Sequence, residues 1–328
     1  MLVTVLMSVY NSDKYLDDAI NSILNQTYKD FEFLIIDDGS TDRTEAIINK
    51  YMLLDSRIVF IKNDHNIGLA SSLNKGINLA KGKYIARQDA DDLSAHDRLE
   101  KQIQFALLNE DIDLVGSNCY IIDINGEVVY ENNTYSKRKD IYKNLLNCKA
   151  IFPHGCVLVK KDILLKAGLY DSRFYYSQDG ELWLRLIENE AKFHTMEDPL
   201  YYYRSAPRSS DKKYQAQCMY NKVKKMIYSG NADQEAVNNE LAIIKTHISS
   251  NLQFPRPYYM AEYWKGLANG AYLNNGKLLV SYKYLIKALK EKNLLKKYPV
   301  YISLFLIYLF PSSLVKNLFR IDQGTAEG

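Results

Sequence analysis

The chain has 328 residues, of which 47% are hydrophobic and 25% are charged, and its formal net charge is +3. This composition is typical of a globular protein and excludes a disordered chain, and the length suits one large domain with an appendage or two domains. A charge of +3 is too small to indicate nucleic-acid binding, and no basic stretch is interleaved with aromatic residues as in a nucleic-acid-binding face.

The cysteines and the N-terminal segment indicate a cytoplasmic protein. The cysteines form no CxxC pair and no zinc-binding spacing, so we expect reduced, mostly packed thiols. The chain opens directly into an apolar run with no basic segment before it, which predicts a first strand rather than a signal peptide. The cysteines are Cys119, Cys148, Cys156 and Cys218.

Strand-like runs alternate with helical patterns from residue 1 to about 110. Ser12 is a candidate N-cap of the first helix, and Asp42 with Glu45 is a candidate capping box of the second. The alternation predicts a parallel sheet with right-handed crossovers, whose ligands bind at the carboxyl ends of the strands. The predicted strands are 3–10, 31–36, 57–62 and 83–87, and the predicted helices are 12–26, one that opens near 42, and 69–80.

The pattern changes after a predicted helix at 96–108. Two apolar runs, 114–124 and 127–130, are joined at Asn125-Gly126, which is a strong hairpin signal, so we expect a mixed sheet. One α/β domain is predicted over 1–205 and a helical region over 206–328. The other predicted elements are a strand at 155–159 and helices at 137–146, 162–167, 179–190, 211–228, 233–250, 257–272 and 277–290.

A basic and then apolar segment lies near the C-terminus. Six lysines between Lys283 and Lys297 precede the charge-free run 300–310. This run is too short to cross a bilayer core of about 30 Å, which needs roughly 20 residues. Lysines beside Tyr, Phe and Leu favour an interfacial anchor on an anionic leaflet, so 298–320 is a candidate membrane-interface segment. A buried core helix with a solvated lysine face is the alternative.

Residues 37–40, Asp37-Asp38-Gly39-Ser40, form a first acidic loop after a predicted strand. A carboxylate there can accept a hydrogen bond from a nucleotide base or from ribose hydroxyls. Neither GxGxxG nor GxxxxGK[ST] occurs in the chain, so a metal ion would have to hold any phosphates. A plain turn with a helix cap is the alternative.

A second acidic loop, residues 89–92, follows the apolar run 84–86. Alternate residues on extended backbone face the same way, so Asp89 and Asp91 should be able to converge. Converging carboxylates repel one another unless a cation compensates, and all-oxygen ligation suits Mg²⁺ or Mn²⁺. The alternative is an acidic loop that caps the next helix, with Ser94 as its N-cap.

Five segments in this order resemble glycosyltransferase family 2, over about residues 1–205. They are SVYN at 8–11, IDDGSTD at 36–42, NIGLA at 66–70, KGKYIARQDADD at 81–92 and QDGELWLRL at 178–186. The resemblance implies a GT-A fold, with a mixed, mostly parallel sheet flanked by helices and a helical C-terminal region. It further implies a donor half over about 1–110 and an acceptor half over 111–205.

The resemblance also implies roles for individual residues. Asp37 or Asp38 would hold the uracil or ribose of the donor, and Asp89 the ribose. Asp91 would bind Mn²⁺ or Mg²⁺ on the donor diphosphate. Asp179 would be the catalytic base, which must take the proton of the acceptor hydroxyl as the new bond forms. A single displacement of this kind inverts the anomeric centre.

Several positions leave alternatives open. Gln178 stands where the family commonly has Glu, which removes a neighbouring charge from Asp179. His154 is a candidate contact to acceptor or metal, or a packed histidine. Trp183 and Arg185 favour structural packing, and residues 201–204 could wall a sugar site or form a strand edge.

By resemblance, the chain is a metal-dependent, inverting hexosyltransferase in bacterial surface-polysaccharide synthesis. Its donor would be UDP-glucose or UDP-galactose, and its acceptor a saccharide on undecaprenyl diphosphate, as in O-antigen or capsule assembly. It would act in the cytoplasm at the inner face of the cell membrane, with no nucleic-acid partner. One alternative is a non-catalytic membrane-associated binding protein of the same fold. The other is a Mg²⁺-dependent phosphatase, because Asp89-Ala90-Asp91 superficially resembles the Asp-x-Asp motif of such enzymes.

Overall fold

The N-terminal half of the protein is a parallel sheet, as the alternating pattern predicts. The computed structural model describes residues 2–133, 141–147, 151–207, 211–228, 233–249, 256–275 and 278–290. The first elements are β1 (Val3–Val9), α1 (Leu16–Leu24), β2 (Phe31–Asp37), α2 (Thr44–Met52), β3 (Ile58–Lys62), α3 (Leu69–Leu79) and β4 (Tyr84–Gln88). The strands lie in the order β3–β2–β1–β4, and every neighbouring pair is parallel.

The second half of the sheet is mixed, and its hairpin lies where the sequence predicts it. The next elements are β5 (Leu93–Ser94), α4 (Arg98–Leu108), β6 (Leu114–Ile122), β7 (Val128–Asn132), β8 (Leu158–Lys160) and β9 (Phe193–Arg204). The order continues β4–β8–β6–β9–β5, with β7 paired to β6. Strands β6 and β9 are parallel, and the other new pairs are antiparallel. Gly126 has φ +84° in the hairpin turn, a conformation that favours glycine.

Two apolar clusters cover the two faces of the parallel strands. On one face, α3 packs through Leu73 and Ile77 against Leu6 of β1. On the other face, α1, α2 and α4 pack against the alternate residues of β1 and β2, such as Val5 and Phe33. All residues of β1 and β2 are therefore buried, as expected for parallel strands with helices on both sides.

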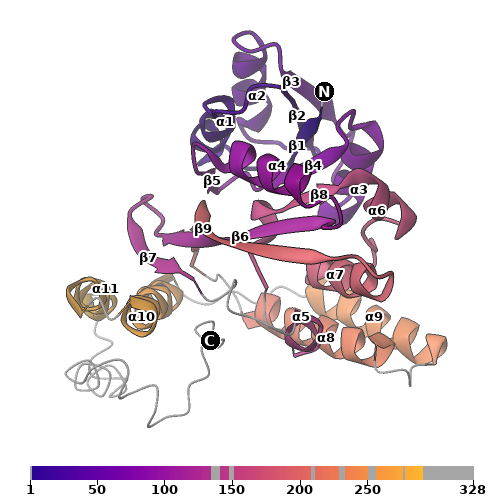
Figure 1. Ribbon diagram of the computed structural model, residues 1–328. Helices are drawn as coiled ribbons and strands as arrows, with labels where there is room; N and C mark the ends of the chain where they lie inside the picture. Colours follow the sequence, from indigo (N-terminus) through magenta and orange to yellow (C-terminus); the bar gives the residue numbers. More distant parts are fainter. Residues whose placement is uncertain are drawn as a thin grey trace.

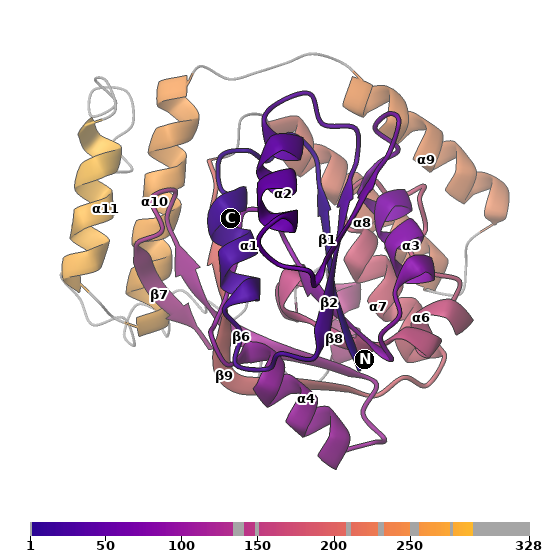
Figure 2. The ribbon, with the colours of Figure 1, turned by 90° about the horizontal axis from the view of Figure 1, so that it is seen from above.

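The C-terminal helices form two pairs. The remaining helices are α5 (Ile141–Leu146), α6 (Lys161–Lys166), α7 (Gln178–Glu188), α8 (Asp211–Tyr228), α9 (Gln234–Ser249), α10 (Arg256–Asn275) and α11 (Leu278–Lys290). Figure 1 shows both pairs on the far side of β6 and β9 from the N-terminal half, with α10–α11 beside β7 and α8–α9 near α7. Figure 2 shows the two pairs apart from each other, with α10 and α11 side by side at the left and α8 and α9 at the right. The division of the chain into domains at residue 205 stays a prediction.

Some local predictions are wrong. Ser12 does not cap α1, because its hydroxyl bonds to the Tyr10 carbonyl and the helix begins four residues later. Glu45 does not complete a capping box, because its carboxylate pairs with Lys62 at 2.6 Å. Ser94 lies in strand β5 and is not the N-cap of α4. The strand predicted at 155–159 begins at Leu158, because residues 154–156 form a 3₁₀ turn.

The predictions for the thiols and the tail fall partly outside the described residues. Cys119 and Cys156 are buried and unbonded, whereas Cys218 is exposed. Cys148, residues 137–140 of the predicted helix at 137–146, and the segment 298–320 lie outside the described residues. Among the described helices, none is both long and apolar enough to cross a membrane.

Candidate active site

The first acidic loop is held by neutral hydrogen-bond donors. Its Asp38 carboxylate accepts bonds from the Asn63 side-chain amide and from the backbone N–H groups of Ile67 and Gly68, each at 2.9 Å. Asp37 ends β2, and its Oδ1 accepts a bond from the Ser40 N–H at 2.9 Å. Its buried Oδ2 has no hydrogen-bond partner among the described residues. Asp38 thus fastens the 63–68 loop, while Asp37 keeps an unused acceptor oxygen.

Asp89 is oriented by a buried arginine. Its Oδ1 lies 2.6 Å from Nη2 of Arg87, which is 2% exposed and also donates to the Gln88 carbonyl. The Asp89 backbone N–H donates to the Tyr201 hydroxyl at 3.2 Å. A Cβ at Gly155 would lie 2.8 Å from the other Asp89 oxygen, so this carboxylate approaches the 154–156 turn too closely for a larger residue. Asp89 is thereby fixed between β4, β9 and that turn.

Asp91 and Asp92 differ in their exposure to solvent. Asp91 is exposed, whereas Asp92 is buried and accepts a bond from the Arg204 N–H at 2.6 Å. Burial raises the pKa of Asp92 well above its usual range, and the negative charges of Asp91 and Asp89 raise it further. The Arg204 Nε also donates to the Asp91 carbonyl at 2.7 Å. The loop therefore concentrates negative charge that a cation would offset.

The structure gathers no complete set of protein metal ligands in the part of the chain that it describes. No group of three or more His, Cys, Asp or Glu side chains there could hold a metal ion by itself. A divalent ion at Asp91 would thus need ligands beyond the His, Cys, Asp and Glu side chains of the described residues, such as the oxygens of a donor diphosphate.

A buried arginine that the sequence analysis did not single out supports the second acidic loop. Arg98 is fully buried and donates to Ser94 Oγ at 2.8 Å, to Gln88 Oε1 at 3.2 Å and to the Arg87 carbonyl at 2.7 Å. Burial lowers its pKa, yet its partners are neutral oxygens on both sides of the loop. A cation in the first turn of a helix interacts unfavourably with the helix dipole. The position of Arg98 at the start of α4 therefore could have indicated that this arginine has a specific structural role.

His154 lies within electrostatic reach of both Asp89 and Asp179. The His154 ring nitrogen Nε2 lies 2.8 Å from the Tyr170 hydroxyl. Burial and the Arg87 charge lower the pKa of His154 to about 4, against the opposing charges of Asp179 and Asp89. Burial also raises the pKa of Tyr170. His154 is therefore neutral near pH 7, with two carboxylates and a protonated phenol as neighbours.

The helix that carries Asp179 is held by packing. Gln178 and Trp183 are buried, and Arg185 pairs with Glu181 at 2.8 Å, which agrees with the structural interpretation of Trp183 and Arg185. The preceding residue, Ser177, has φ +60°, so the chain turns sharply into the first turn of α7. Asp179 is half-buried at this turn.

Comparison with solved structures defines the fold class. Staphylococcus aureus TarS in complex with UDP-GlcNAc matches with a TM-score of 0.55 and 16% identity, over 89% of each chain. Mannosyltransferase PcManGT from Pyrobaculum calidifontis, in complex with GDP-Man and Mn²⁺, matches with a TM-score of 0.54 and 17% identity, over 98% of this chain and 88% of that one. The protein has the GT-A fold, as predicted.

Sequence comparison gives the family. Residues 4–168 match the model described as glycosyl transferase family 2. An uncharacterized glycosyltransferase of Methanocaldococcus jannaschii is 43% identical over 64% of this chain and 72% of its own length. The O-antigen biosynthesis glycosyltransferase WbnJ of Escherichia coli is 37% identical over 64% of this chain and 82% of its own length. The chain belongs to glycosyltransferase family 2 and is a nucleotide-sugar glycosyltransferase, which leaves no support for the phosphatase alternative.

Proposed function

We propose that the protein transfers a hexose, with inversion and with a divalent metal ion, from a nucleotide sugar to a saccharide acceptor. The proposed donor is UDP-glucose or UDP-galactose. The proposed acceptor is a saccharide linked to undecaprenyl diphosphate in the synthesis of O-antigen or capsule. Its relative WbnJ is named for O-antigen biosynthesis, and the fold neighbours were solved with UDP-GlcNAc and GDP-Man, which supports a nucleotide-sugar donor.

The observation that carries this function is that two carboxylates from distant segments lie near the same histidine, His154, whose turn approaches Asp89. The charges of Asp89 and Asp179 both act on the His154 ring, although Asp89 follows β4 and Asp179 opens α7. A single displacement needs a base near the donor, because the acceptor hydroxyl loses its proton as the sugar moves. In our proposal, Asp89 holds the donor ribose and Asp179 takes that proton.

The first acidic loop then binds the nucleoside. Asp37 offers the oxygen that has no partner among the described residues, so a base N–H or ribose hydroxyl could bond to it. At Asp38, the nucleotide would instead compete with the three donors of the 63–68 loop. Either residue is proposed to contact the base or ribose, and separate Asn variants distinguish them.

The second acidic loop fits a divalent cation. The exposed Asp91 carboxylate lies in a region where negative charge raises the pKa of buried Asp92, so a bound cation would relieve that repulsion. When bound, Mg²⁺ or Mn²⁺ would stabilise negative charge on the leaving nucleoside diphosphate. Neutral His154 is a candidate contact to the acceptor or to the metal, with its orientation fixed by Tyr170.

Ligand-dependent stability tests the donor and the metal together. A panel of UDP-, GDP- and dTDP-sugars is screened for protection against thermal unfolding with Mn²⁺, because a ligand that binds only the folded state raises its stability. We expect protection by UDP-glucose or UDP-galactose, and protection by UDP-GlcNAc or GDP-mannose alone would reassign the donor sugar.

Turnover of the protecting donor then tests the chemistry. Hydrolysis or transfer should stop in EDTA and return with Mn²⁺, and full activity in EDTA would contradict metal dependence. The product anomer, read by NMR, should be inverted relative to the donor. Retention would exclude a single displacement with Asp179 as base, and a protein that binds donor without turnover would support the non-catalytic alternative.

We also propose that the protein binds the inner membrane surface through its C-terminal segment. Six lysines lie from Lys283 to Lys297, and the first two form ion pairs within the described residues. Lys283 pairs with Glu127 at 2.8 Å, and Lys287 pairs with Asp123 at 3.4 Å. The lysines that follow Lys287 are therefore the ones proposed to contact anionic lipid, at Lys290, Lys292, Lys296 and Lys297.

A further inference from the structure

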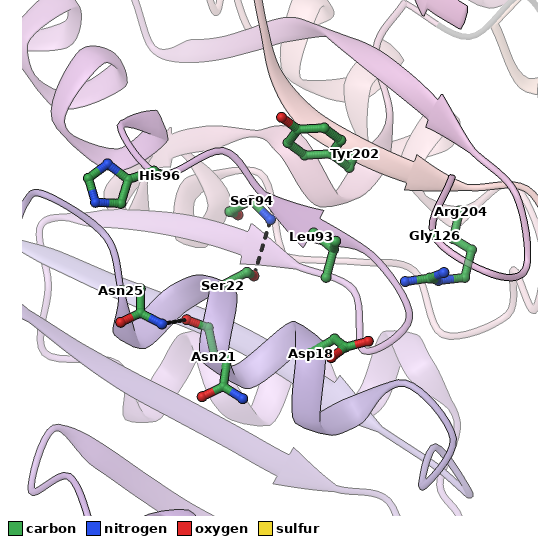
Figure 3. A pocket seen from close by; sticks show the side chains of 10 residues that line it. All are labelled: Asp18, Asn21, Ser22, Asn25, Leu93, Ser94, His96, Gly126, Tyr202 and Arg204. Carbon is green, nitrogen blue, oxygen red and sulfur yellow. Dashed lines mark hydrogen bonds between the residues drawn. The ribbon is translucent and has the colours of Figure 1, made fainter. Parts of the chain in front are cut away.

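A groove of about 470 Å³ lies between α1 and the paired strands β5 and β9. Its volume is within the range of small-molecule sites. Figure 3 shows polar side chains of α1 along one side, and Ser94, His96 and Tyr202 on the other. The proposed roles of Asp89, Asp91 and Asp179 do not use this groove.

The α1 side of the groove offers hydrogen-bond acceptors. Asp18, Asn21 and Asn25 are spaced so that they share one face of the helix, and all three are exposed. The amide groups of the two asparagines already donate, Asn21 to the Tyr51 hydroxyl at 2.7 Å and Asn25 to the Asn21 carbonyl at 2.9 Å. Their side-chain oxygens and the Asp18 carboxylate accept no bond from the rest of the described chain, so these oxygens remain for hydroxyl donors.

The opposite side of the groove carries an aromatic ring. Tyr202 is half-buried and stacks on Tyr120 with ring centroids 5.0 Å apart. Neighbouring side chains of a strand point to opposite sides, so buried Tyr201 faces Asp89 while Tyr202 faces the groove. A supported ring of this kind is suited to contact the C–H face of a sugar.

The chemistry of the lining excludes other ligand classes. Arg204 is the single arginine or lysine of the lining, and its Nε and Nη1 already donate to the Asp91 and Asp123 carbonyls. With Asp18 opposite, the groove does not suit a phosphate or another anion. Leu93 is its single aliphatic side chain, so an apolar ligand has little to contact, and one carboxylate is too few for a metal ion. A neutral ligand rich in hydroxyl groups remains.

We propose that this groove is a saccharide-binding site that holds part of the acceptor or product chain away from the reacting hydroxyl. It adjoins the second acidic loop, because Leu93 and Ser94 directly follow Asp92 and Arg204 bonds to the Asp91 carbonyl. The binding of a sugar follows from the lining alone, whereas its assignment to the acceptor chain rests on the proposed function. Longer acceptors should therefore bind more tightly than monosaccharide acceptors.

The test uses the full-length protein on an array of bacterial glycans, without donor and with EDTA present. We expect retention of neutral oligosaccharides and an affinity that falls roughly tenfold, or about 1.4 kcal/mol, in Tyr202→Ser and in Asn25→Lys. Tyr203→Ser is the matched control, because this exposed neighbour lies on the same strand and points to the other side. Its binding should equal that of the unchanged protein.

The outcomes distinguish failure of the proposed saccharide site from failure of the proposed transferase function. No retained glycan, retention unaffected by Tyr202→Ser and Asn25→Lys, or an equal loss in Tyr203→Ser would overturn the site. Thermal unfolding checks that each variant is folded, and the exposed Asn25 carries the test if Tyr202→Ser is not. Because the assay contains neither donor nor metal, absence of transferase activity would leave the glycan result readable. In that case the sugar would bind, but not as an acceptor.

Discussion

Both acidic loops lie at the carboxyl end of a buried parallel strand, but they are held in different ways. Neutral N–H groups bind Asp38 in the first loop. Guanidinium groups hold the second loop: Arg87 pairs with Asp89, Arg98 bonds to residues on both sides of the loop, and Arg204 bonds to the Asp91 carbonyl. This difference is consistent with the proposed roles, in which the first loop binds a neutral nucleoside and the second faces ligands whose charge changes during the reaction.

The largest expected effect separates the two loops. Asp91→Asn should nearly abolish transfer, because it removes a formal charge from the proposed metal site without disturbing the core. Asp37→Asn or Asp38→Asn should chiefly raise the KM for the donor. Steady-state kinetics with varied Mn²⁺ measure this difference, and Asp64→Asn, at an exposed aspartate of the 63–68 loop, is the control. A larger loss of kcat from the first loop would reverse the comparison.

The next effect concerns Asp179, the proposed catalytic base. Asp179→Asn should lose roughly 10²-fold or more in kcat, the scale of a lost general base, while its donor affinity stays unchanged. Single-turnover kinetics and calorimetric donor binding separate the two quantities. Glu190→Gln, at an exposed residue of the turn that follows α7, should keep full turnover. Near-normal turnover in Asp179→Asn would place the base elsewhere.

The supports of the two loops should differ in stability. Arg98→Met should lower the free energy of unfolding by about 3 kcal/mol or more, because the Ser94 hydroxyl, the Gln88 amide oxygen and buried carbonyls lose their donor. Asp38→Asn should cost only about 1 kcal/mol, since an amide oxygen still accepts from the 63–68 loop. Urea unfolding measures both, and equal losses would contradict the contrast between the loops.

The burial of His154 also predicts a pH dependence of stability. His154 has a folded-state pKa of about 4, below its ordinary value of 6.5, so below pH 6.5 the unfolded chain binds a proton that the folded chain does not. Stability should therefore fall from about pH 6.5 to pH 4, by on the order of 3 kcal/mol from this residue. His154→Gln should flatten that fall in urea unfolding at pH 7 and pH 4.5. His65→Gln, at an exposed histidine, should not.

The parallel half of the fold was predictable because its signals are local. Apolar runs such as 31–36 lie between helical patterns, and both faces of their strands are buried, so a run alone identifies the strand. Strand β5 has two residues and exists only through its pairing with Tyr201 and Tyr202, so no local pattern could reveal it. The long strand β9 was also missed over most of its length, because its burial follows no simple alternation.

The sequence is enough to propose the residues of the candidate site but not the contacts that hold them in place. Asp89 and Asp179 belong to sequence motifs, so the sequence identifies them as candidates but does not show where they lie in the fold. Arg98 acts through Gln88, Ser94 and backbone carbonyls, and these contacts exist only once β4, β5 and α4 are packed. Asp38 differs from Asp37 in its hydrogen bonds because the 63–68 loop donates to Asp38, and this contact exists only in the folded chain. Such long-range contacts leave no periodic signal in the chain.

The smallest expected effect lies farthest from both loops, in the C-terminal tail. A chain that ends at Lys292 should lose binding to vesicles that contain anionic lipid, because it lacks Lys296, Lys297 and the apolar run 300–310. Each near-surface lysine is worth on the order of 1 kcal/mol, so sedimentation with vesicles should weaken as salt rises. Donor hydrolysis should continue, since both acidic loops lie in the N-terminal half. Binding that persists on neutral vesicles at high salt would exclude the electrostatic contribution, and a shortened chain that unfolds would favour a buried helix over a membrane anchor.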